Sequence, residues 1–292
     1  MRDRVSAGVD GSEESRAAAH WAAQEAVVRQ VPLRLVHAVD WLLDPVVPGP
    51  DRQDAEQWAD RALTDTSEEL HRRHPQLEIT TCSLKGRPAA ALAAEAADAG
   101  LLVLGSRGLG GLVGFIIGSV AMSTLVATDT PVVLVRVADG PDGPDDPGTG
   151  SNPEVVVGVD IHEACDPVLD FAFEEAERRS CPLVVVHGWS LPPVFSYAPA
   201  LDPGVQKEMA DGLGTTLREV LSPWERKYPR LAVDARVVIG QPAIQILDAA
   251  SGAALVVVGR RIHRPALGAR IGPITHAVMH HATSPVAIVA HG

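Results

Sequence analysis

The sequence contains few cysteines, few aromatic residues and no strong positive charge. Its 292 residues include three cysteines and 4% aromatic residues, and acidic side chains outnumber basic ones to give a net charge of −12. The cysteines lack Cys-x-x-Cys spacing, which argues against a disulfide framework and indicates reduced thiols. An acidic chain repels nucleic acid and anionic lipid unless a basic patch intervenes. We therefore expect neither nucleic acid nor a membrane as a partner.

Long apolar runs and a phosphate-binding lysine motif are also missing. No run is long enough to span a bilayer, and Met1 to Arg4 lead straight into an expected strand rather than a signal peptide. These features predict a cytoplasmic protein. Lys85 is the single lysine of the first half, and no Gly-Lys-Ser/Thr sequence occurs, which excludes a Walker A loop.

The chain consists of two similar halves. Matching segments are Val5–Asp10 with Val155–Asp160 and Pro32–Ala38 with Pro182–Gly188, at an offset of 150, and Leu102–Gly105 with Val256–Gly259 and Pro131–Val135 with Pro285–Val289, at an offset of 154. A stretch of Gly, Pro, Asp and Ser separates the halves and is typical of a linker. We predict a first domain over residues 1–138, a linker over 139–153 and a second domain over 154–292.

Each half alternates short β-branched runs with alanine-rich stretches of helical period. In the first half the expected strands are 31–39, 77–84, 101–104 and 132–137, and the expected helices are 14–29, 54–74, 88–99 and 120–126. Continuously apolar strands indicate burial on both faces, hence a parallel sheet between helix layers. The prediction is an α/β fold of two tandem, doubly wound, five-stranded domains. Ligands of such sheets bind where the strand order reverses.

A glycine-rich loop follows the expected strand 101–104 and leads into a helix. It runs Gly105-Ser106-Arg107-Gly108, then nine residues that include Gly110 and Gly111, then Gly118-Ser119-Val120. Glycines permit close backbone approach to a ligand, and the free N–H groups of a helix start attract anions. The third glycine of a dinucleotide fingerprint is missing, since Val113 occupies its place. The loop therefore predicts a different kind of phosphate site, although glycines at a tight surface turn give the same pattern.

Together these motifs resemble the universal stress protein family, in its tandem, ATP-binding form, over nearly the whole chain. The resemblance implies a Rossmann-like, nucleotide-binding α-hydrolase-like fold and ATP as ligand, with or without Mg²⁺. Residues implied to hold ribose and phosphates are Gly105, Arg107, Gly108, Gly110, Gly111, Gly118, Ser119 and Val120. Asp10 is implied to lie at the nucleotide, Gly8 to leave room for it, and Ala38 to offer backbone groups to adenine.

The second half departs from this pattern. Ile262 replaces the second glycine of the loop, and Pro273 replaces the serine, so one N–H donor is lost. The corresponding binding residues are Gly158, Asp160, Gly188, Gly259, Arg261 and Gly272. Two interpretations stay open: the second site is degenerate and structural, or the additional cations Arg260, Arg261, His263 and Arg264 compensate for lost backbone donors.

No catalytic residue and no metal site is predicted. No second acid, histidine or lysine stands beside Asp10 in the sequence, and His276 and His280 share a helix face without a zinc-protease motif. We therefore expect a regulatory, stress-response protein that binds ATP. The alternatives are a slow ATPase or phosphotransferase, and an interaction scaffold with a vestigial pocket. The apolar end strands predict a homodimer or pairing of domains within the chain.

Overall fold

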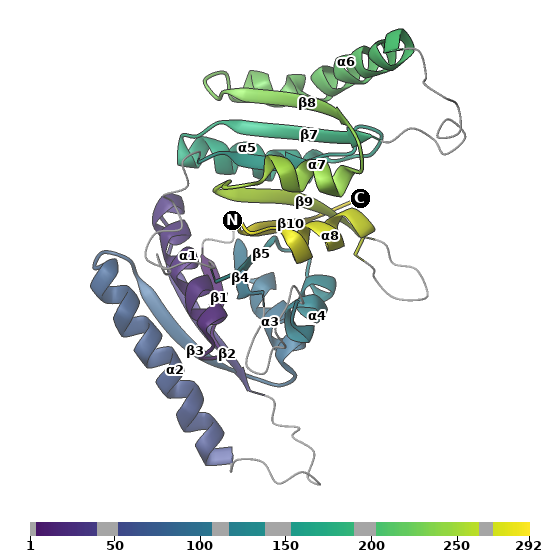
Figure 1. Ribbon diagram of the computed structural model, residues 1–292. Helices are drawn as coiled ribbons and strands as arrows, with labels where there is room; N and C mark the ends of the chain where they lie inside the picture. Colours follow the sequence, from purple (N-terminus) through teal and green to yellow (C-terminus); the bar gives the residue numbers. More distant parts are fainter. Residues whose placement is uncertain (1–3, 40–51, 107–116, 138–152, 190–202, 263–270) are drawn as a thin grey trace. The chain divides into compact units, whose positions relative to one another are not determined.

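The computed structural model describes residues 4–39, 52–106, 117–137, 153–189, 203–262 and 271–292. The chain divides into two compact units, Met1–Pro147 and Gly148–Gly292. Both units are α/β structures with parallel strands (Figure 1). In the part of the chain that is described, no helix is both long and apolar enough to cross a membrane.

The first unit is a five-stranded parallel sheet. Its elements are β1 (Val5–Gly8), α1 (Glu13–Arg29), β2 (Leu33–Val39), α2 (Arg52–Arg73), β3 (Ile79–Lys85), α3 (Pro88–Ala97), β4 (Leu101–Gly105), α4 (Ser119–Ala127) and β5 (Val132–Val135). The strand order is β3-β2-β1-β4-β5, with Val5 of β1 paired to Leu33 of β2 and Leu101 of β4. The order reverses between β1 and β4, so the switch point lies there.

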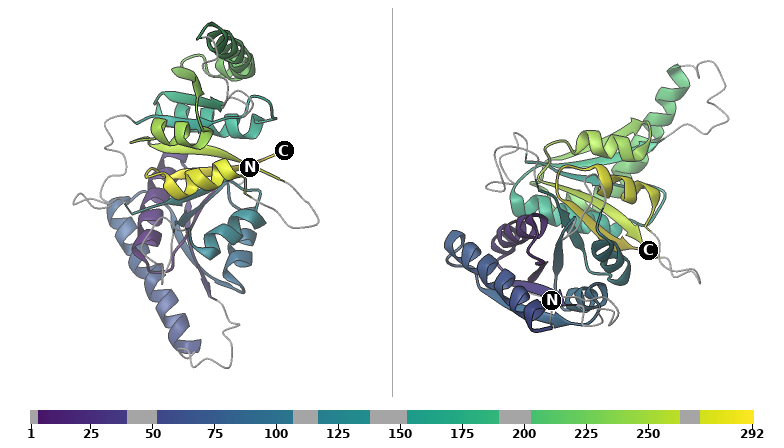
Figure 2. Two further views of the ribbon diagram at one scale, coloured as in Figure 1. Left: turned by 45° about the vertical axis from the view of Figure 1, so that its right-hand side comes forward. Right: turned by 60° about the horizontal axis from the view of Figure 1, so that its bottom comes forward.

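Helices cover both faces of this sheet. Helices α1 and α2 pack on one face, and α3 and α4 pack together on the other. Both views in Figure 2 show this arrangement. Burial on both faces explains why β4 and β5 are apolar throughout. Helix α1 begins at Ser12, whose hydroxyl accepts the Ser15 N–H, and it ends at Gln30 in the left-handed region.

The second unit repeats this architecture. Its elements are β6 (Val155–Gly158), α5 (Asp166–Arg179), β7 (Leu183–Trp189), α6 (Pro203–Lys227), β8 (Val233–Ile239), α7 (Pro242–Ala249), β9 (Leu255–Arg261), α8 (Pro273–His281) and β10 (Val286–His291). The strand order is β8-β7-β6-β9-β10, and all pairings are parallel. Helices α5 and α6 contact one face of the sheet, and α7 and α8 pack together on the other.

The predicted fold class is confirmed in both units. The expected strand over 31–39 begins two residues later, at Leu33, because Pro32 lacks the N–H that a strand residue donates. The expected helix over 88–99 ends at Ala97. Strands β5 and β10 each stand last in the strand order of their own unit.

Candidate functional site

The carboxyl ends of neighbouring strands gather the predicted residues of each unit. In the first unit, β1 lies between β2 and β4, so Asp10, Ala38 and Gly105 follow or end three adjacent strands. In the second unit, β6 lies between β7 and β9 in the same way. This edge of an open parallel sheet is where small ligands bind.

In the first unit, the glycine loop joins the end of β4 to the start of α4. The N–H of Gly118 donates to the carbonyl of Ser106 at 2.9 Å, which ties the two ends of the loop together. Gly118 is the N-cap of α4, and no side chain of the described residues caps the helix, so its first N–H groups lack the partner that a capping side chain would supply. Ser119 and Val120 begin the helix and are exposed. The remaining predicted loop residues, Arg107, Gly108, Gly110 and Gly111, lie outside the described residues.

The carboxylate of Asp10 accepts hydrogen bonds from the turn that follows it in the chain. Its Oδ1 accepts the N–H of Ser12 at 3.0 Å and the hydroxyl of Ser12 at 2.5 Å. The N–H of Asp10 donates to the hydroxyl of Ser15 at 3.2 Å. This network starts α1 and fixes the chain where β1 ends.

Protein groups already occupy the space beside Gly8 and Gly11. A Cβ atom on Gly8 would come within 2.7 Å of Leu104, so the missing side chain permits packing against β4. Gly11 has φ +80°, and Trp58 of α2 lies over it. The Trp58 ring also meets His37 edge-on at 5.5 Å. An aromatic residue from α2 therefore borders the switch point of the first unit.

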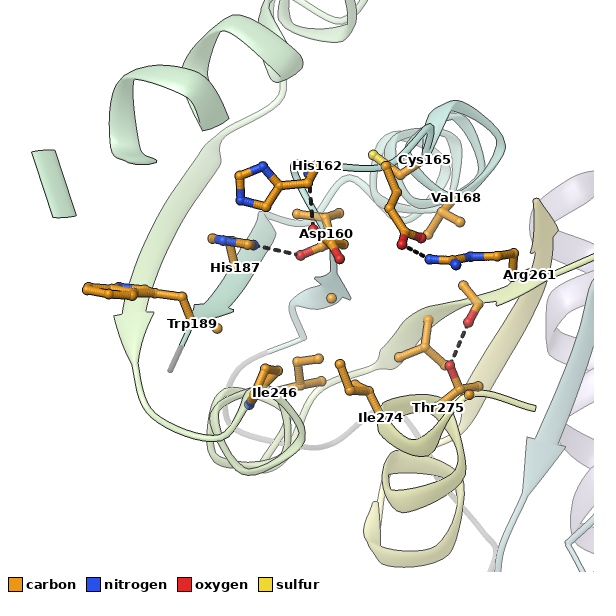
Figure 3. Close-up of a pocket in the computed structure, with 18 of the residues that line it drawn as sticks. Asp160, His162, Cys165, Val168, His187, Trp189, Ile246, Arg261, Ile274 and Thr275 are labelled. Atoms are coloured by element: carbon orange, nitrogen blue, oxygen red, sulfur yellow. Dashed lines mark hydrogen bonds and ion pairs between the residues drawn. The ribbon is translucent and has the colours of Figure 1, made fainter. Parts of the chain in front are cut away.

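The second unit holds a large pocket at its switch point. The pocket has a volume of about 1120 Å³, and all six residues that were predicted for this unit line it: Gly158, Asp160, Gly188, Gly259, Arg261 and Gly272. In Figure 3, His162, His187 and Trp189 lie along one side of the pocket, and Ile246, Ile274 and Thr275 lie across from them.

Three of the pocket glycines lie close against other protein atoms. A Cβ atom on Gly158 would collide with Ile246, and one on Gly259 would lie 2.6 Å from Nε2 of His291. The backbone of α7 approaches Gly188 most closely, since a Cβ there would lie 2.6 Å from Cα of Pro242. These glycines therefore allow helix and strand to pack tightly around the pocket.

Charges in the described part of the pocket offset one another. Arg261 forms an ion pair with Glu163, and Asp160 accepts the N–H of His162 at 3.0 Å. Arg260 is buried, with 3% of its surface exposed. Four cations were candidates to compensate for the lost backbone N–H donors. Of these, Arg261 is paired with Glu163 and Arg260 is buried, whereas His263 and Arg264 lie outside the described residues.

Histidine 291 at the rim is held in its neutral form. Its Nδ1 lies 3.1 Å from the carbonyl oxygen of Ala164. Burial lowers the pKa of His291, the hydrogen bond to Ala164 opposes that shift, and the charges of Arg261 and Arg260 add to it. At neutral pH this imidazole therefore supplies no positive charge to the pocket.

Comparison with known proteins identifies the family. A model described as "Universal stress protein family" matches residues 1–136 and 152–290, one match for each unit. The chain belongs to the universal stress protein family.

Relatives match this universal stress protein along nearly its whole length. A universal stress protein of Mycobacterium tuberculosis is 34% identical over 96% of this chain and 94% of its own, and one of Mycolicibacterium smegmatis is 32% identical over 97% and 95%. The crystal structure of a universal stress protein from Archaeoglobus fulgidus aligns with a TM-score of 0.70 at 16% identity, covering 100% of this chain and 97% of that one. These likenesses support the tandem form and the fold.

The tight packing at Gly188 makes a stability prediction for this universal stress protein. Gly188→Ala should destabilise the second unit by about 1–3 kcal/mol, because the new methyl group would press on the backbone of Pro242, which cannot move as a side chain could. The first unit offers the control, since Ala38 stands at the matching position and Ala38→Gly removes a methyl group without creating a clash. Urea unfolding of both variants checks the difference, and equal stability of Gly188→Ala and the wild type would contradict it.

The pocket thiol of this universal stress protein is unreactive. Cys165 lies in the pocket wall, and burial raises its pKa to about 11, with a smaller contribution from the negative charge of Asp166. All three cysteines are free thiols, and only Cys82 is partly exposed. A redox role for Cys165 therefore finds no support.

Alkylation rates test this assignment. At pH 8, iodoacetamide should modify Cys82 first and leave Cys165 and Cys181 largely unmodified, because both are buried and burial raises the pKa of both thiols. Peptide mass spectrometry after timed quenching measures the three rates. Faster modification of Cys165 than of Cys82 would show a thiolate that the pocket stabilises.

The histidine pair on α8 carries no metal-ligand set. The rings of His276 and His280 lie 4.3 Å apart between centroids, as their spacing of four predicts. No group of three or more histidine, cysteine, aspartate or glutamate side chains arranged for a metal occurs among the described residues.

Sequence reasoning missed three polar pocket residues of this universal stress protein: His162, His187 and Trp189. A signal for them exists in the repeat alignment. His187 matches His37, whereas His162 and Trp189 replace Ser12 and Val39 of the first unit. Positions that become aromatic or basic in one repeat alone, beside an otherwise shared strand end, indicate a change in the chemistry of the pocket.

Proposed function

We propose that this chain is a regulatory universal stress protein that binds ATP in its first unit. The observation that supports the proposal is the uncapped start of α4 beside the end of β4, at the switch point of the sheet. Free N–H groups at a helix start, together with the helix dipole, favour a phosphate group. Among the described residues, no group forms a hydrogen bond with the hydroxyl of Ser106, which is buried next to this start.

In this proposal the strand ends around β1 hold the rest of the nucleotide. Ala38 at the end of β2 offers backbone groups to the adenine, and Gly105 at the end of β4 lies beside the ribose and phosphates. Arg107, Gly108, Gly110, Gly111, Gly118, Ser119 and Val120 complete the phosphate contacts. Mg²⁺ accompanies the phosphates where it is present. The protein acts in the cytoplasm, and nucleotide occupancy biases its conformation or its pairing through the end strands.

A regulatory role fits the chemistry better than a catalytic one. Phosphoryl transfer needs a positioned base and a metal ion in addition to a phosphate cradle. The Oδ1 atom of Asp10 already accepts two hydrogen bonds from Ser12. If turnover occurs, Asp10→Ala should reduce it.

The nucleotide content of the purified protein tests the proposal. We expect about one adenine nucleotide per chain, mostly ATP, when the protein is denatured and the released ATP, ADP and AMP are quantified. Two nucleotides per chain would assign a second site to the second unit. A chain that copurifies with none and shows no calorimetric response to ATP would overturn the proposal in favour of a scaffold.

A further inference from the structure

The pocket of the second unit contains an unused hydrogen-bond acceptor. His187 exposes only 4% of its surface, and its Nδ1 lies 3.1 Å from the carbonyl oxygen of Val159. A carbonyl oxygen can only accept, so Nδ1 carries the proton, and Nε2 of the neutral ring must be an acceptor. Nε2 is buried and has no partner in the described part of the chain.

An unused donor lies two residues further along the same strand. Nε1 of Trp189 is buried and finds no hydrogen-bond partner among the residues that the structure describes, and an indole N–H can only donate. Residues i and i+2 of a strand point to the same face, roughly 6.5 Å apart. Buried polar groups are normally paired, so two orphaned groups beside one pocket indicate a missing partner. That partner offers one donor and one acceptor.

The wall opposite these groups is apolar and suits a flat ring. Ile246, Ile274 and Val168 line the pocket, and Figure 3 shows Ile246 and Ile274 across from the His187 and Trp189 side. The volume of about 1120 Å³ is slightly larger than the roughly 300–1,000 Å³ that is usual for small-molecule sites, so the pocket has room for a small ligand.

A glycine in α6 opens the pocket further. Gly212 of α6 and Trp58 of α2 occupy equivalent positions, because each lies the same number of residues before the C-terminal end of its helix. Gly212 lines the pocket, and a Cβ atom added there would meet nothing within 4 Å. Glycine within a helix costs about 1 kcal/mol relative to alanine, and at Gly212 close packing does not require it. At this position of the helix the second unit thus has a glycine where the first has Trp58.

The described pocket residues do not favour phosphate. Asp160 and Glu163 are acidic, and the guanidinium of Arg261 is paired with Glu163. Pro273 begins α8 and removes one of the N–H groups that an anion would use at a helix start. The two units therefore offer different chemistry at the same place in the fold.

We propose that the pocket of the second unit binds an uncharged, planar heteroaromatic molecule through Nε2 of His187 and Nε1 of Trp189, without a phosphate group. The ligand donates to His187, accepts from Trp189 and packs its ring against Ile246 and Ile274. This site is separate from the ATP site proposed for the first unit and does not depend on it. The two units then sense two chemically distinct molecules.

Binding of a neutral lactam tests the hydrogen-bond pattern. Quinazolin-4-one carries a ring N–H and ring acceptors on a flat bicycle, and naphthalene has the same shape without either group. In the full chain, the indole N–H resonance of Trp189, assigned by its loss in Trp189→Phe, should shift saturably with quinazolin-4-one. Affinity for quinazolin-4-one should exceed that for naphthalene at least tenfold, and His187→Phe should remove this preference. Absence of a saturable shift, or equal affinity for both probes, would overturn the proposal.

Matched glycine variants test the position of the ligand. Gly212 and Gly214 both lie within α6, and an added Cβ meets nothing within 4 Å at either, but only Gly212 lines the pocket. Gly212→Leu should weaken quinazolin-4-one binding at least tenfold, whereas Gly214→Leu should leave it unchanged. Both should retain the fold, since leucine forms helices better than glycine. Equal affinity in the two variants would place the ligand elsewhere and overturn the proposal.

A nucleotide competition separates this proposal from ATP binding by the first unit. In Gly118→Val, which is designed to silence the first site, ATP should not displace quinazolin-4-one from the second unit. Displacement by ATP at concentrations where adenosine has no effect would make the second pocket a phosphate site and contradict the inference. Failure of the wild type to bind ATP, with the lactam still bound, would count against the first-unit function alone.

Discussion

Gly118→Val is expected to weaken ATP binding at least tenfold, which corresponds to about 1.4 kcal/mol. Gly118 is the N-cap of α4, next to the free N–H groups that would meet the phosphates. A branched side chain at this position would stand between the helix start and the ligand. Calorimetric titration of the nucleotide-free protein with ATP measures the change.

The second unit supplies the matched control. Gly272 is the N-cap of α8, with φ −63° and ψ 155°, and Gly118 has φ −63° and ψ 146°. Both backbones are extended and accept any residue, so valine introduces no backbone strain at either position. Gly272→Val should leave ATP binding unchanged, because Gly272 belongs to the second unit and not to the proposed ATP site. It should also retain the fold, because a Cβ at Gly272 meets no atom of the described residues within 4 Å. Unchanged affinity in folded Gly118→Val would refute the phosphate-loop assignment.

The sequence is sufficient to predict which residues gather at the switch point of each sheet, but not how the space around them is filled. Apolar runs such as Leu101–Gly105 predict buried parallel strands, and the order of elements then places Asp10 and Gly105 at adjacent strand ends. Sequence spacing cannot show that Ile246 fills the space beside Gly158. That space depends on how deeply α7 packs on the sheet, which is a tertiary property.

One difference between the two switch points, Trp58 in the first unit against Gly212 in the second, also escaped sequence reasoning. Trp58 and Gly212 become comparable only when the two helices are aligned from their C-terminal ends. The reason is that the offset between the repeats changes from 150 to 154 before these positions, which corresponds to an insertion of four residues in the second unit. The proposed roles of His187 and Trp189 depend on which of their ring nitrogens have hydrogen-bond partners, and a comparison of the two repeat sequences cannot show this. The glycines of the loop indicate where a phosphate group would bind, whereas the chemistry of the rest of the second pocket depends on residues of β7 and α6.

Glu95→Ala is expected to destabilise the first unit by about 2–3 kcal/mol. Glu95 lies on α3 with 7% of its surface exposed, and its Oε1 accepts the hydroxyl of Ser6 at 2.8 Å and the guanidinium of Arg4 at 3.0 Å. Arg34 lies 3.6 Å from the same oxygen. Removal of the carboxylate leaves the fully buried Ser6 hydroxyl without an acceptor. The arginines are partly exposed and can regain water, which keeps the loss below that of a fully buried ion pair.

The second unit indicates how this loss can be reversed. Val156 and Ala249 occupy the positions of Ser6 and Glu95, so the second unit packs apolar groups where the first has a polar cluster. When both partners of a buried hydrogen bond become apolar, no group is left unsatisfied and the cost can vanish. The double variant Ser6→Val/Glu95→Ala should therefore be more stable than Glu95→Ala alone, by at least about 1 kcal/mol.

Urea unfolding followed by hydrogen exchange in peptides of the first unit measures this cycle. The signal must come from that unit, because a chain of two units need not unfold in a single step. We expect the two substitutions to be strongly non-additive, as contacting residues are. Additive losses would mean that the carboxylate stabilises the unit through Arg4 and Arg34 rather than through Ser6. In that case the important difference between the units would be the residue before the first strand, which is Arg4 before β1 and Glu154 before β6. An acidic residue at this position needs no carboxylate partner, so the second unit can do without a counterpart of Glu95.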